Sequence, residues 1–240
     1  MPAGIITTTT TTATTMIDAA ATLRLLVWLS PSFPTGAYAY SHGLEWAVET
    51  GDIQDGESLR VWLQDVLTNG AGRSDAILLR HAHRCAADAD ALAGIAELAA
   101  ATAPSRERQA ETLGQGSAFI AAATPWITQA LADLAGRIGR ERIAYPVAVG
   151  ALAGGHDIPE DAVVAGYLET FAANLISAAV RLVPLGQTAG LRVLATLEPV
   201  ILRLASETRL ATLDDLGGCA FRSDIATMRH ETQYTRLFRS

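Results

Sequence analysis

Lysine is absent from this chain of 240 residues, whose 18 basic residues are all arginines. A Walker A loop, a pyridoxal phosphate enzyme and a protein kinase each depend on a lysine that holds phosphate or forms a Schiff base. The chain on its own therefore cannot carry out any of these three chemistries. Cysteine is also scarce, since Cys85 and Cys219 are the only two. Two cysteines are too few for a disulfide framework and are typical of a reducing compartment.

Charged and aromatic residues are sparse as well, at 18% and 6% of the chain, whereas half of the residues are hydrophobic. Acidic residues outnumber basic ones by 25 to 18, so we expect no attraction of the whole molecule to nucleic acid or anionic lipid. No stretch approaches the roughly 18 consecutive apolar residues of a membrane span, and we find no secretory leader pattern. The sequence therefore predicts a soluble, cytoplasmic protein with no membrane segment.

Three regions of the chain differ in composition. Residues 7–15 are threonine apart from Ala13, and because this run has no amphipathic period we expect residues 1–17 to be a disordered tail. Residues 18–221 space their apolar side chains as helices do and lack strand-like alternation, which predicts an all-α domain of about ten helices. Residues 222–240 carry four arginines against two acidic residues, whereas the other 221 residues carry 14 arginines against 23 acidic residues. A basic terminal segment thus follows an acidic body.

Capping residues and chain breaks mark the individual helices. Asp18 is a candidate N-cap, and Asp55 with Ser58 is expected to start another helix. Pro125 is expected at the first position of a helix, and Pro199 should kink or split a long one. The predicted helical ranges are 18–28, 40–50, 55–69, 75–101 as one or two helices, one from 106, 126–138, 158–184 and 187–210.

Candidate catalytic and metal-binding residues do not form a coherent set. His81 and Cys85 share a helical face, as do His42 and Glu45, but two donors do not close a metal site. His230 and Glu231 resemble the start of a zincin motif, yet Tyr234 stands where the second histidine would be. We therefore predict no metal ligand, no cofactor and no catalytic residue. The alternative is an all-α enzyme that binds a small molecule in a pocket between helices.

The basic segment has the composition of a protein interface. Arg222, Arg229 and Arg236 recur every seven residues and would line one side of a helix. An aromatic and aliphatic face would lie beside them, made of His230, Tyr234, Leu237 and Phe238. Arginine and tyrosine next to large apolar groups favour a docking segment over a solvated tail.

Three motifs in this order resemble the UreF family of urease accessory proteins. The first runs from Pro34 to Glu45 and contains Tyr40-Ser-His-Gly-Leu-Glu45; the second, Ala-Ala-Val-Arg-Leu-Val-Pro-Leu-Gly-Gln, spans residues 178–187. The third, Met-Arg-His-Glu-Thr-Gln-Tyr-Thr-Arg-Leu-Phe, spans residues 228–238. The chain departs from the family pattern at Thr35, where isoleucine or valine is common, and at Gly116-Ser117, where Gly-Arg is frequent.

The resemblance implies a non-catalytic, all-helical protein that forms a homodimer. It also implies a complex with the accessory protein UreD, called UreH in some species, and with the GTPase UreG. This complex would deliver nickel to the urease apoprotein and regulate the GTPase, whose phosphate-binding lysine the present chain lacks.

The resemblance further implies which residues contact partners. Arg236 would be the charged anchor, because its planar guanidinium can form two parallel hydrogen bonds. Tyr40 would lie on the partner-facing side, and Arg181 and Gln187 would shape the dimer centre or an internal passage. The predicted partner-binding residues are Tyr40, Arg181, Gln187, His230, Glu231, Gln233, Tyr234, Arg236, Leu237 and Phe238.

Overall fold

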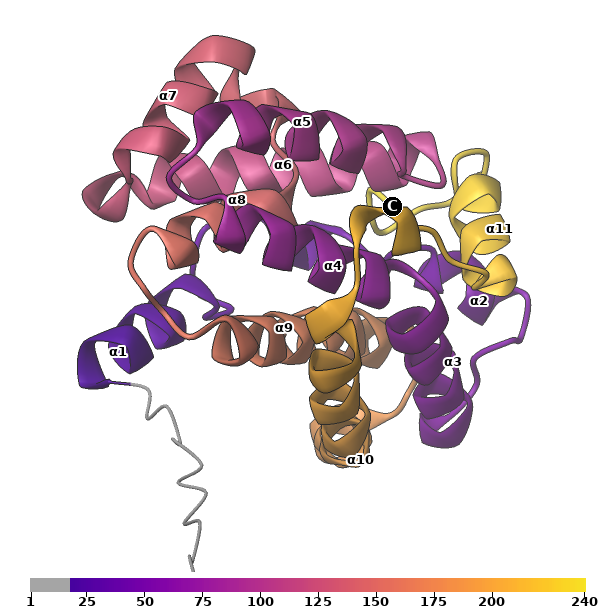
Figure 1. Ribbon diagram of the computed structural model, residues 1–240. Coiled ribbons are helices and arrows are strands. Elements are labelled where there is room, and N and C mark those ends of the chain that lie inside the picture. The colour runs from indigo at the N-terminus through magenta and orange to yellow at the C-terminus, as the bar shows by residue number, and fades with distance from the viewer. Residues whose placement is uncertain (1–17) are drawn as a thin grey trace, which may run out of the picture.

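The computed structural model describes residues 18–240, and every regular element in that range is helical (Figure 1). The all-α prediction is therefore confirmed, whereas the expected disordered tail at residues 1–17 lies outside the described residues. The α-helices are α1 (Ala19–Trp28), α2 (Leu44–Glu49), α3 (Gly56–Asn69), α4 (Ala71–Arg84), α5 (Ala89–Ala101), α6 (Arg106–Ala122), α7 (Gln129–Ile138), α8 (Tyr145–Gly154), α9 (Glu160–Leu182), α10 (Gly186–Glu207) and α11 (Phe221–His230). Short 3-10 helices are η1 (Ala37–Ala39), η2 (Thr124–Trp126), η3 (Arg140–Arg142), η4 (Thr208–Leu210) and η5 (Leu213–Asp215).

Several helices start where the sequence predicts a capping residue. The Asp18 carboxylate accepts the backbone N–H of Ala21 at 2.6 Å, which satisfies a free donor of α1. Asp55 and Ser58 form a reciprocal capping box at the start of α3. Local sequence therefore determines these two helix starts without help from distant contacts.

The helix α8 is the centre of the fold, because nine of its ten residues are buried. Figure 1 shows α5, α6 and α7 on one side of α4 and α8, and α9 and α10 on the other. The helices α4 and α8 pack closely because Gly150 and Gly154 of α8 have no side chain. A Cβ atom at either glycine would collide with the backbone carbonyl of Leu79 or His83 in α4.

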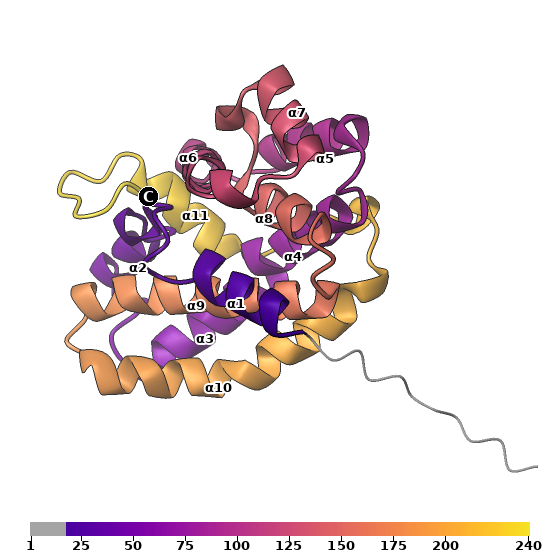
Figure 2. The same ribbon diagram turned by 90° about the vertical axis from the view of Figure 1, so that its left-hand side faces the viewer.

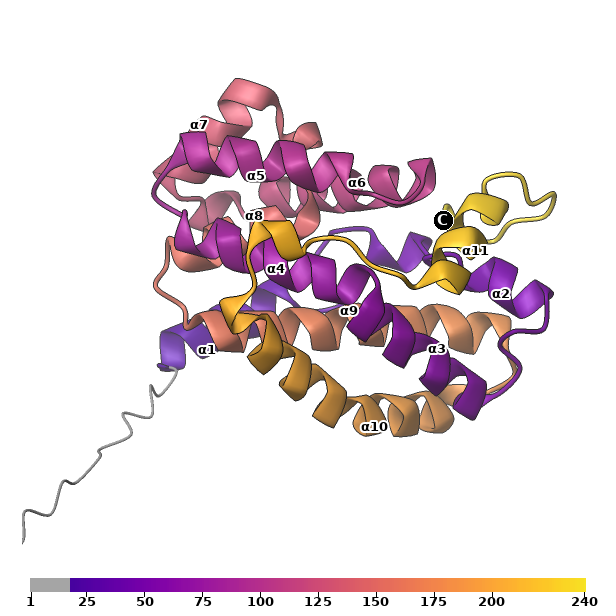
Figure 3. The same cartoon turned by 45° about the vertical axis from the view of Figure 1, so that its right-hand side comes forward.

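The two longest helices form an antiparallel pair, with α10 running back along α9 (Figure 2). The connection turns at Gly186, whose φ of 70° lies in the left-handed region that favours glycine. Pro199 lies inside α10 and does not split it; Figure 3 shows a bent but continuous helix.

The helix α9 is long and apolar enough to cross a membrane, with a mean hydropathy of 1.5 over its most apolar stretch of 18 residues. However, 56% of that stretch is buried inside the protein. We therefore interpret α9 as a core helix of the fold, as its central position in Figure 2 also indicates.

Three predicted boundaries are wrong. The helix expected over 40–50 is shorter and comprises only α2, Leu44–Glu49. His42 and Gly43 have positive φ values of 58° and 76°, which are incompatible with a right-handed helix, so the helix cannot start before them. Pro125 lies in η2, and the following α-helix starts later, at Gln129. The helix expected from residue 75 begins at Ala71, directly after Gly70.

Candidate functional site

The basic carboxyl-terminal segment is folded against the body of the protein. It consists of α11 and of residues 231–240, which we call the strap. Figure 3 shows α11 beside α2, and contacts also join α11 to α6. The entry loop, residues 33–45, includes the first two residues of α2. It approaches α11 at Gly43, where a Cβ atom would lie 2.8 Å from the backbone nitrogen of Thr227. Positive φ and close packing thus both favour glycine in the Ser-His-Gly-Leu-Glu motif.

The strap is not helical, which corrects the expectation that the arginine repeat continues along one helix. The helix α11 ends at His230, so Arg236 does not share a helical face with Arg222 and Arg229. The strap instead runs back to the entry loop and bonds to it through the backbone. The N–H of Ser41 donates to the carbonyl of Ser240 at 2.8 Å, and the N–H of Arg239 donates to the carbonyl of Ala39 at 2.9 Å.

Glu45 is the main attachment point of the strap. Its carboxylate accepts the backbone N–H of Leu237 at 2.6 Å and that of Phe238 at 2.9 Å. The same carboxylate lies 3.2 Å from Nε2 of His230. A single buried side chain therefore holds both the end of α11 and the middle of the strap.

Glu107 of α6 forms a second attachment point. One of its oxygens lies 2.6 Å from Nδ1 of His230, and the other accepts from Nη1 of Arg236 at 2.8 Å. Both ring nitrogens of the fully buried His230 therefore face carboxylates, and a protonated ring would donate to both. Nearby, Glu231 accepts the backbone N–H of Arg106 at 2.9 Å and so supports the start of α6.

A buried polar cluster underlies the last residue of the strap. Glu111 accepts from the Ser240 hydroxyl at 2.6 Å and forms an ion pair with Arg108. Burial by itself raises the pKa of Glu111, but Arg108 and His42 outweigh it and hold that pKa well below its usual value. Burial and, to a smaller extent, Arg108 lower the pKa of His42 to about 4, so this ring is neutral at pH 7.

Arg181 joins the strap to the end of α9. Its guanidinium lies 4.3 Å from the centre of the buried Phe238 ring, and its Nη2 donates to the carbonyl of Tyr38 at 2.8 Å. The cation–π contact connects two of the predicted partner-binding residues within one molecule, and the hydrogen bond connects Arg181 to the entry loop.

The structure separates the predicted partner-binding residues into two groups. His230, Gln233 and Phe238 are buried and hold the segment in place, and Gln233 donates to Glu49. This corrects the expected aromatic face, because His230 and Phe238 point inward. Those on the surface of the segment are Tyr234, Arg236 and Leu237.

Two other predicted residues lie outside this cluster. Tyr40 is half-buried, with its hydroxyl against Gly114 of α6, and lines an internal cavity with Arg108 and Glu111. Gln187 is exposed in the first turn of α10.

Sequence reasoning missed an apolar surface on α11. Phe221, Ile225 and Met228 are 69%, 54% and 49% exposed, and their spacing of four and three residues places them on one side of the helix. Helical periodicity could have found this surface, because apolar residues three and four apart share one face of a helix whether that face is buried or exposed.

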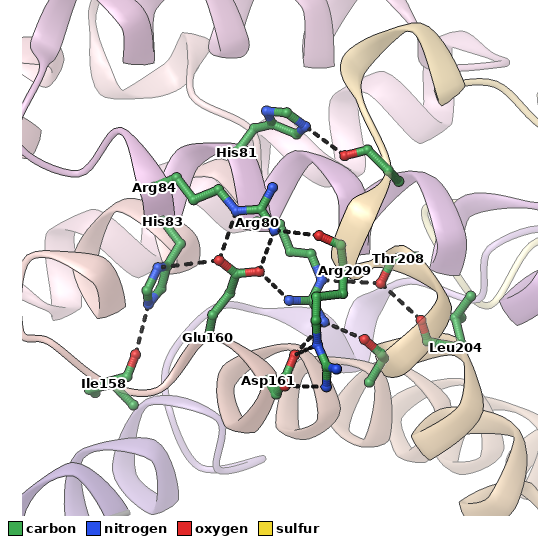
Figure 4. A network of polar contacts seen from close by, with 12 residues as sticks. Arg80, His81, His83, Arg84, Ile158, Glu160, Asp161, Leu204, Thr208 and Arg209 are labelled. Atoms are coloured by element: carbon green, nitrogen blue, oxygen red, sulfur yellow. Dashed lines mark hydrogen bonds and ion pairs between the residues drawn. The ribbon is translucent and has the colours of Figure 1, made fainter. Parts of the chain in front are cut away.

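A separate ionic network connects α4, α9 and η4 (Figure 4). The fully buried Arg80 bonds to Glu160, to Asp161 at 2.8 Å and to the hydroxyl of Thr208 at 3.2 Å. Arg84 and Arg209 complete the pairing of these two carboxylates. Because its charges are paired within the fold, we interpret this network as structural.

Histidine and cysteine residues do not gather into a metal site in residues 18–240. His81 bonds to the carbonyl of Ala211 at 3.1 Å, and His83 to that of Ile158 at 2.7 Å. His42 lies 3.7 Å from Glu111 and packs against the Phe171 ring. Because each of these three histidine rings has contacts within the fold, we interpret them as structural.

Comparison with known proteins gives the same family as the sequence motifs. The UreF family profile matches residues 53–198. Similar proteins include the urease accessory protein UreF of Bradyrhizobium sp. strain BTAi1, 52% identical over 93% of this chain and 94% of the relative. The UreF protein of Rhodopseudomonas palustris strain TIE-1 is also 52% identical, over the same shares of both chains. That of Methylorubrum populi is 52% identical over 94% of this chain and 100% of the relative. This chain therefore belongs to the UreF family of urease accessory proteins, a non-catalytic accessory family.

Proposed function

We propose that this protein acts in the cytoplasm as a scaffold for nickel insertion into urease. It would bind UreD or UreH, recruit the GTPase UreG, and regulate that GTPase while nickel is delivered to the urease apoprotein. Family membership supports a role in urease maturation. The absence of lysine supports a division of labour in which the nucleotide-binding loop belongs to a partner.

The observation that carries this proposal is the two-sided construction of the carboxyl-terminal segment. Its inner residues bond to Glu45 and Glu107, and these contacts order the segment before any partner arrives. Its outer residues present apolar side chains on α11 and Tyr234, Arg236 and Leu237 on the strap. A preordered surface of this composition loses little conformational entropy on binding and suits a protein partner.

Co-purification with UreD or UreH and with UreG tests the docking surface. Ile225→Asp places a charge on the outer side of α11, where Ile225 is 54% exposed, and is expected to abolish capture of these partners. Val61→Asp is the matched control, because Val61 is 52% exposed on α3 and should tolerate the same change. Normal capture by Ile225→Asp, with circular dichroism equal to that of the control, would contradict the proposed surface.

A homodimer is part of the proposal. The turn between α9 and α10 supports it, since Gln187 is exposed there and Arg181 links this end of α9 to Phe238 of the strap. Light scattering after size exclusion should give twice the chain mass of 25.2 kDa. A mass of one chain at micromolar concentration would contradict a stable dimer.

The maturation role itself is tested in a urease-producing host that lacks the chain. We expect low urease activity, restored by the wild-type gene and not by Ile225→Asp. Nickel content of the purified urease separates failed metal delivery from failed expression. Normal nickel content in the deletion host would overturn the proposed role.

A further inference from the structure

A groove of about 490 Å³ between α9 and α10 is separate from the carboxyl-terminal segment, because every residue that lines it belongs to these two helices. All of its lining residues except Glu169 and Glu198 are apolar. Leu191 and Leu202, on the α10 side, are 66% and 56% exposed. The helix α10 therefore presents large apolar side chains to solvent beside an apolar groove.

The helix α1 adds to this apolar surface. Leu29, which follows α1, packs against α9, where a Cβ atom at Gly166 would lie 2.9 Å from its Cδ1, and Figure 2 shows α1 on this side of α9. Three apolar side chains of α1 are between 43% and 66% exposed. Large exposed apolar surfaces of this kind mark interaction sites. The apolar side chains of this surface, which we call the α1–α10 face, are Leu23, Leu26, Val27, Leu191 and Leu202.

The exposed side of α10 is suited to pair with a second copy of itself. Four exposed positions, 191, 195, 198 and 202, are separated by four, three and four residues, which places them on one side of the helix. This spacing is the same in both chain directions, so an antiparallel copy places Leu191 opposite Leu202 of the other copy. Ala195 lies near the centre and is small enough to let the two helices approach closely.

Charged residues beside these positions are complementary between two such copies. Arg192 lies three residues before Ala195, which is opposite Glu198 of the other copy. Because a helix rises about 1.5 Å per residue, Arg192 comes within about 4.5 Å of that Glu198 along the helix axis. In residues 18–240, the one ion pair on α10 joins Arg203 to Glu207, which leaves Arg192 and Glu198 available to pair across an interface.

We propose that a second copy of this chain packs on the α1–α10 face, with the two α10 helices antiparallel about a two-fold axis near residues 195–198. The assignment rests on the homodimer of the proposed function and names the surface that forms it. Gln187 lies one turn before Leu191 on the same side of α10 and so belongs to this interface. No residue of the face belongs to α11 or to the strap, so the dimer leaves the outer side of that segment open to UreD or UreH and to UreG.

A single thiol near the proposed axis tests the face in the full chain. Cys85→Ser and Cys219→Ser remove the two native thiols, and Ala195→Cys then places one thiol on α10 of each copy. We expect a short bismaleimide to convert this variant into a covalent dimer. Ala101→Cys is the matched control, because Ala101 is also an exposed helical alanine but belongs to α5, on the opposite side of α4 and α8 (Figure 1). The control should give no covalent dimer.

Light scattering on the same samples separates this assignment from the homodimer itself. A dimer mass without a crosslink in Ala195→Cys would overturn the assigned face and leave the homodimer in place. A monomer mass would overturn both. Protection of the introduced thiol from maleimide in such a monomer would show that another part of the chain covers the face.

Exchange of the two charges tests the antiparallel register. Arg192→Glu and Glu198→Arg should each weaken the dimer on the order of tenfold or more, because like charges then face each other. The double variant restores opposite signs and should recover most of the affinity, as measured by analytical ultracentrifugation. Both residues are exposed, so circular dichroism should stay equal to that of the wild type. A double variant that dimerises no more tightly than either single variant would overturn the register.

Discussion

Glu45 shows how one buried carboxylate can order a chain segment that has little core of its own. Residues 237 and 238 present two adjacent backbone N–H groups, and the two oxygens of the Glu45 carboxylate accept one each. The cost of burying this polar group is offset by these hydrogen bonds and by the nearby ring of His230. Glu45 of the entry-loop motif therefore has an intramolecular role, which is to hold the strap.

Glu45→Gln should release the strap. Glutamine has an NH2 group in place of one carboxylate oxygen. One of the two backbone N–H groups is therefore left without its acceptor. We expect the free energy of unfolding to fall by roughly 2–3 kcal/mol. Hydrogen exchange at Leu237 and Phe238 should become faster in the variant. Glu49→Gln is the control, because exposed Glu49 accepts only from Gln233, and exchange rates that do not differ between the two variants would refute this account.

Asp75 makes stability depend on pH in a direction that can be calculated. Burial raises its pKa from 3.8 to about 6, against the opposing effects of Arg108 and Tyr167. Between these values the folded protein binds more protons than the unfolded chain, so the free energy of unfolding falls as pH rises through this window. Asp75→Asn removes this dependence while it keeps an acceptor for Tyr167.

The Asp75→Asn variant should match the wild type near pH 4 and exceed it at pH 7 by on the order of 2–3 kcal/mol, at 1.36 kcal/mol per pKa unit. Urea unfolding from pH 4 to pH 7.5 measures the difference. Other titrating groups, including His42, are common to both proteins and cancel to first order. Parallel stability curves would show that Asp75 ionises as freely in the fold as in the unfolded chain.

At the scale of elements, the contact between α4 and α8 depends on the absence of side chains. Gly150→Ala should destabilise the protein by about 2–4 kcal/mol, because the added methyl group meets the Leu79 carbonyl and forces the helices apart. Gly136→Ala is the control, since a Cβ there meets no atom within 4 Å and alanine favours the helix α7 by up to about 1 kcal/mol. Thermal unfolding of both variants gives the comparison, and a neutral Gly150→Ala would indicate that the contact is looser than described.

The sequence could predict those helix boundaries that local capping residues determine. Asp18 and Asp55 determine the starts of α1 and α3 through their own neighbouring N–H groups. The left-handed conformation of His42 is not coded locally, because it depends on packing against Phe171 and on the approach of α11 to Gly43. Likewise, the inward direction of His230 follows from Glu45 and Glu107, which are 185 and 123 residues away in the chain. The motifs predict the candidate site, but only the tertiary contacts separate its inner and outer residues.

At the scale of the whole molecule, the chain brings its three characteristic motifs together. The entry loop near the amino end binds the strap at the carboxyl end, and Arg181 from the middle motif contacts both. The three motifs therefore form one structural unit, although more than 130 residues separate the first from the second. This arrangement couples the outer binding surface to the stability of the fold.

Arg236 and Phe238 distinguish binding from folding within this unit. Arg236 is half-exposed and makes one ion pair with Glu107, so Arg236→Ala should change the free energy of unfolding by no more than about 1 kcal/mol. The affinity of Arg236→Ala for the proposed UreD or UreH partner should nevertheless fall on the order of thirtyfold, as for an interface arginine that contributes about 2 kcal/mol. Phe238 is buried under Arg181, so Phe238→Ala should cost about 3–4 kcal/mol of stability and weaken partner binding only through loss of the strap. Urea unfolding and surface plasmon resonance on both variants separate the two effects. A stability loss in Arg236→Ala as large as that in Phe238→Ala, with partner affinity unchanged, would assign Arg236 to the fold instead of the interface.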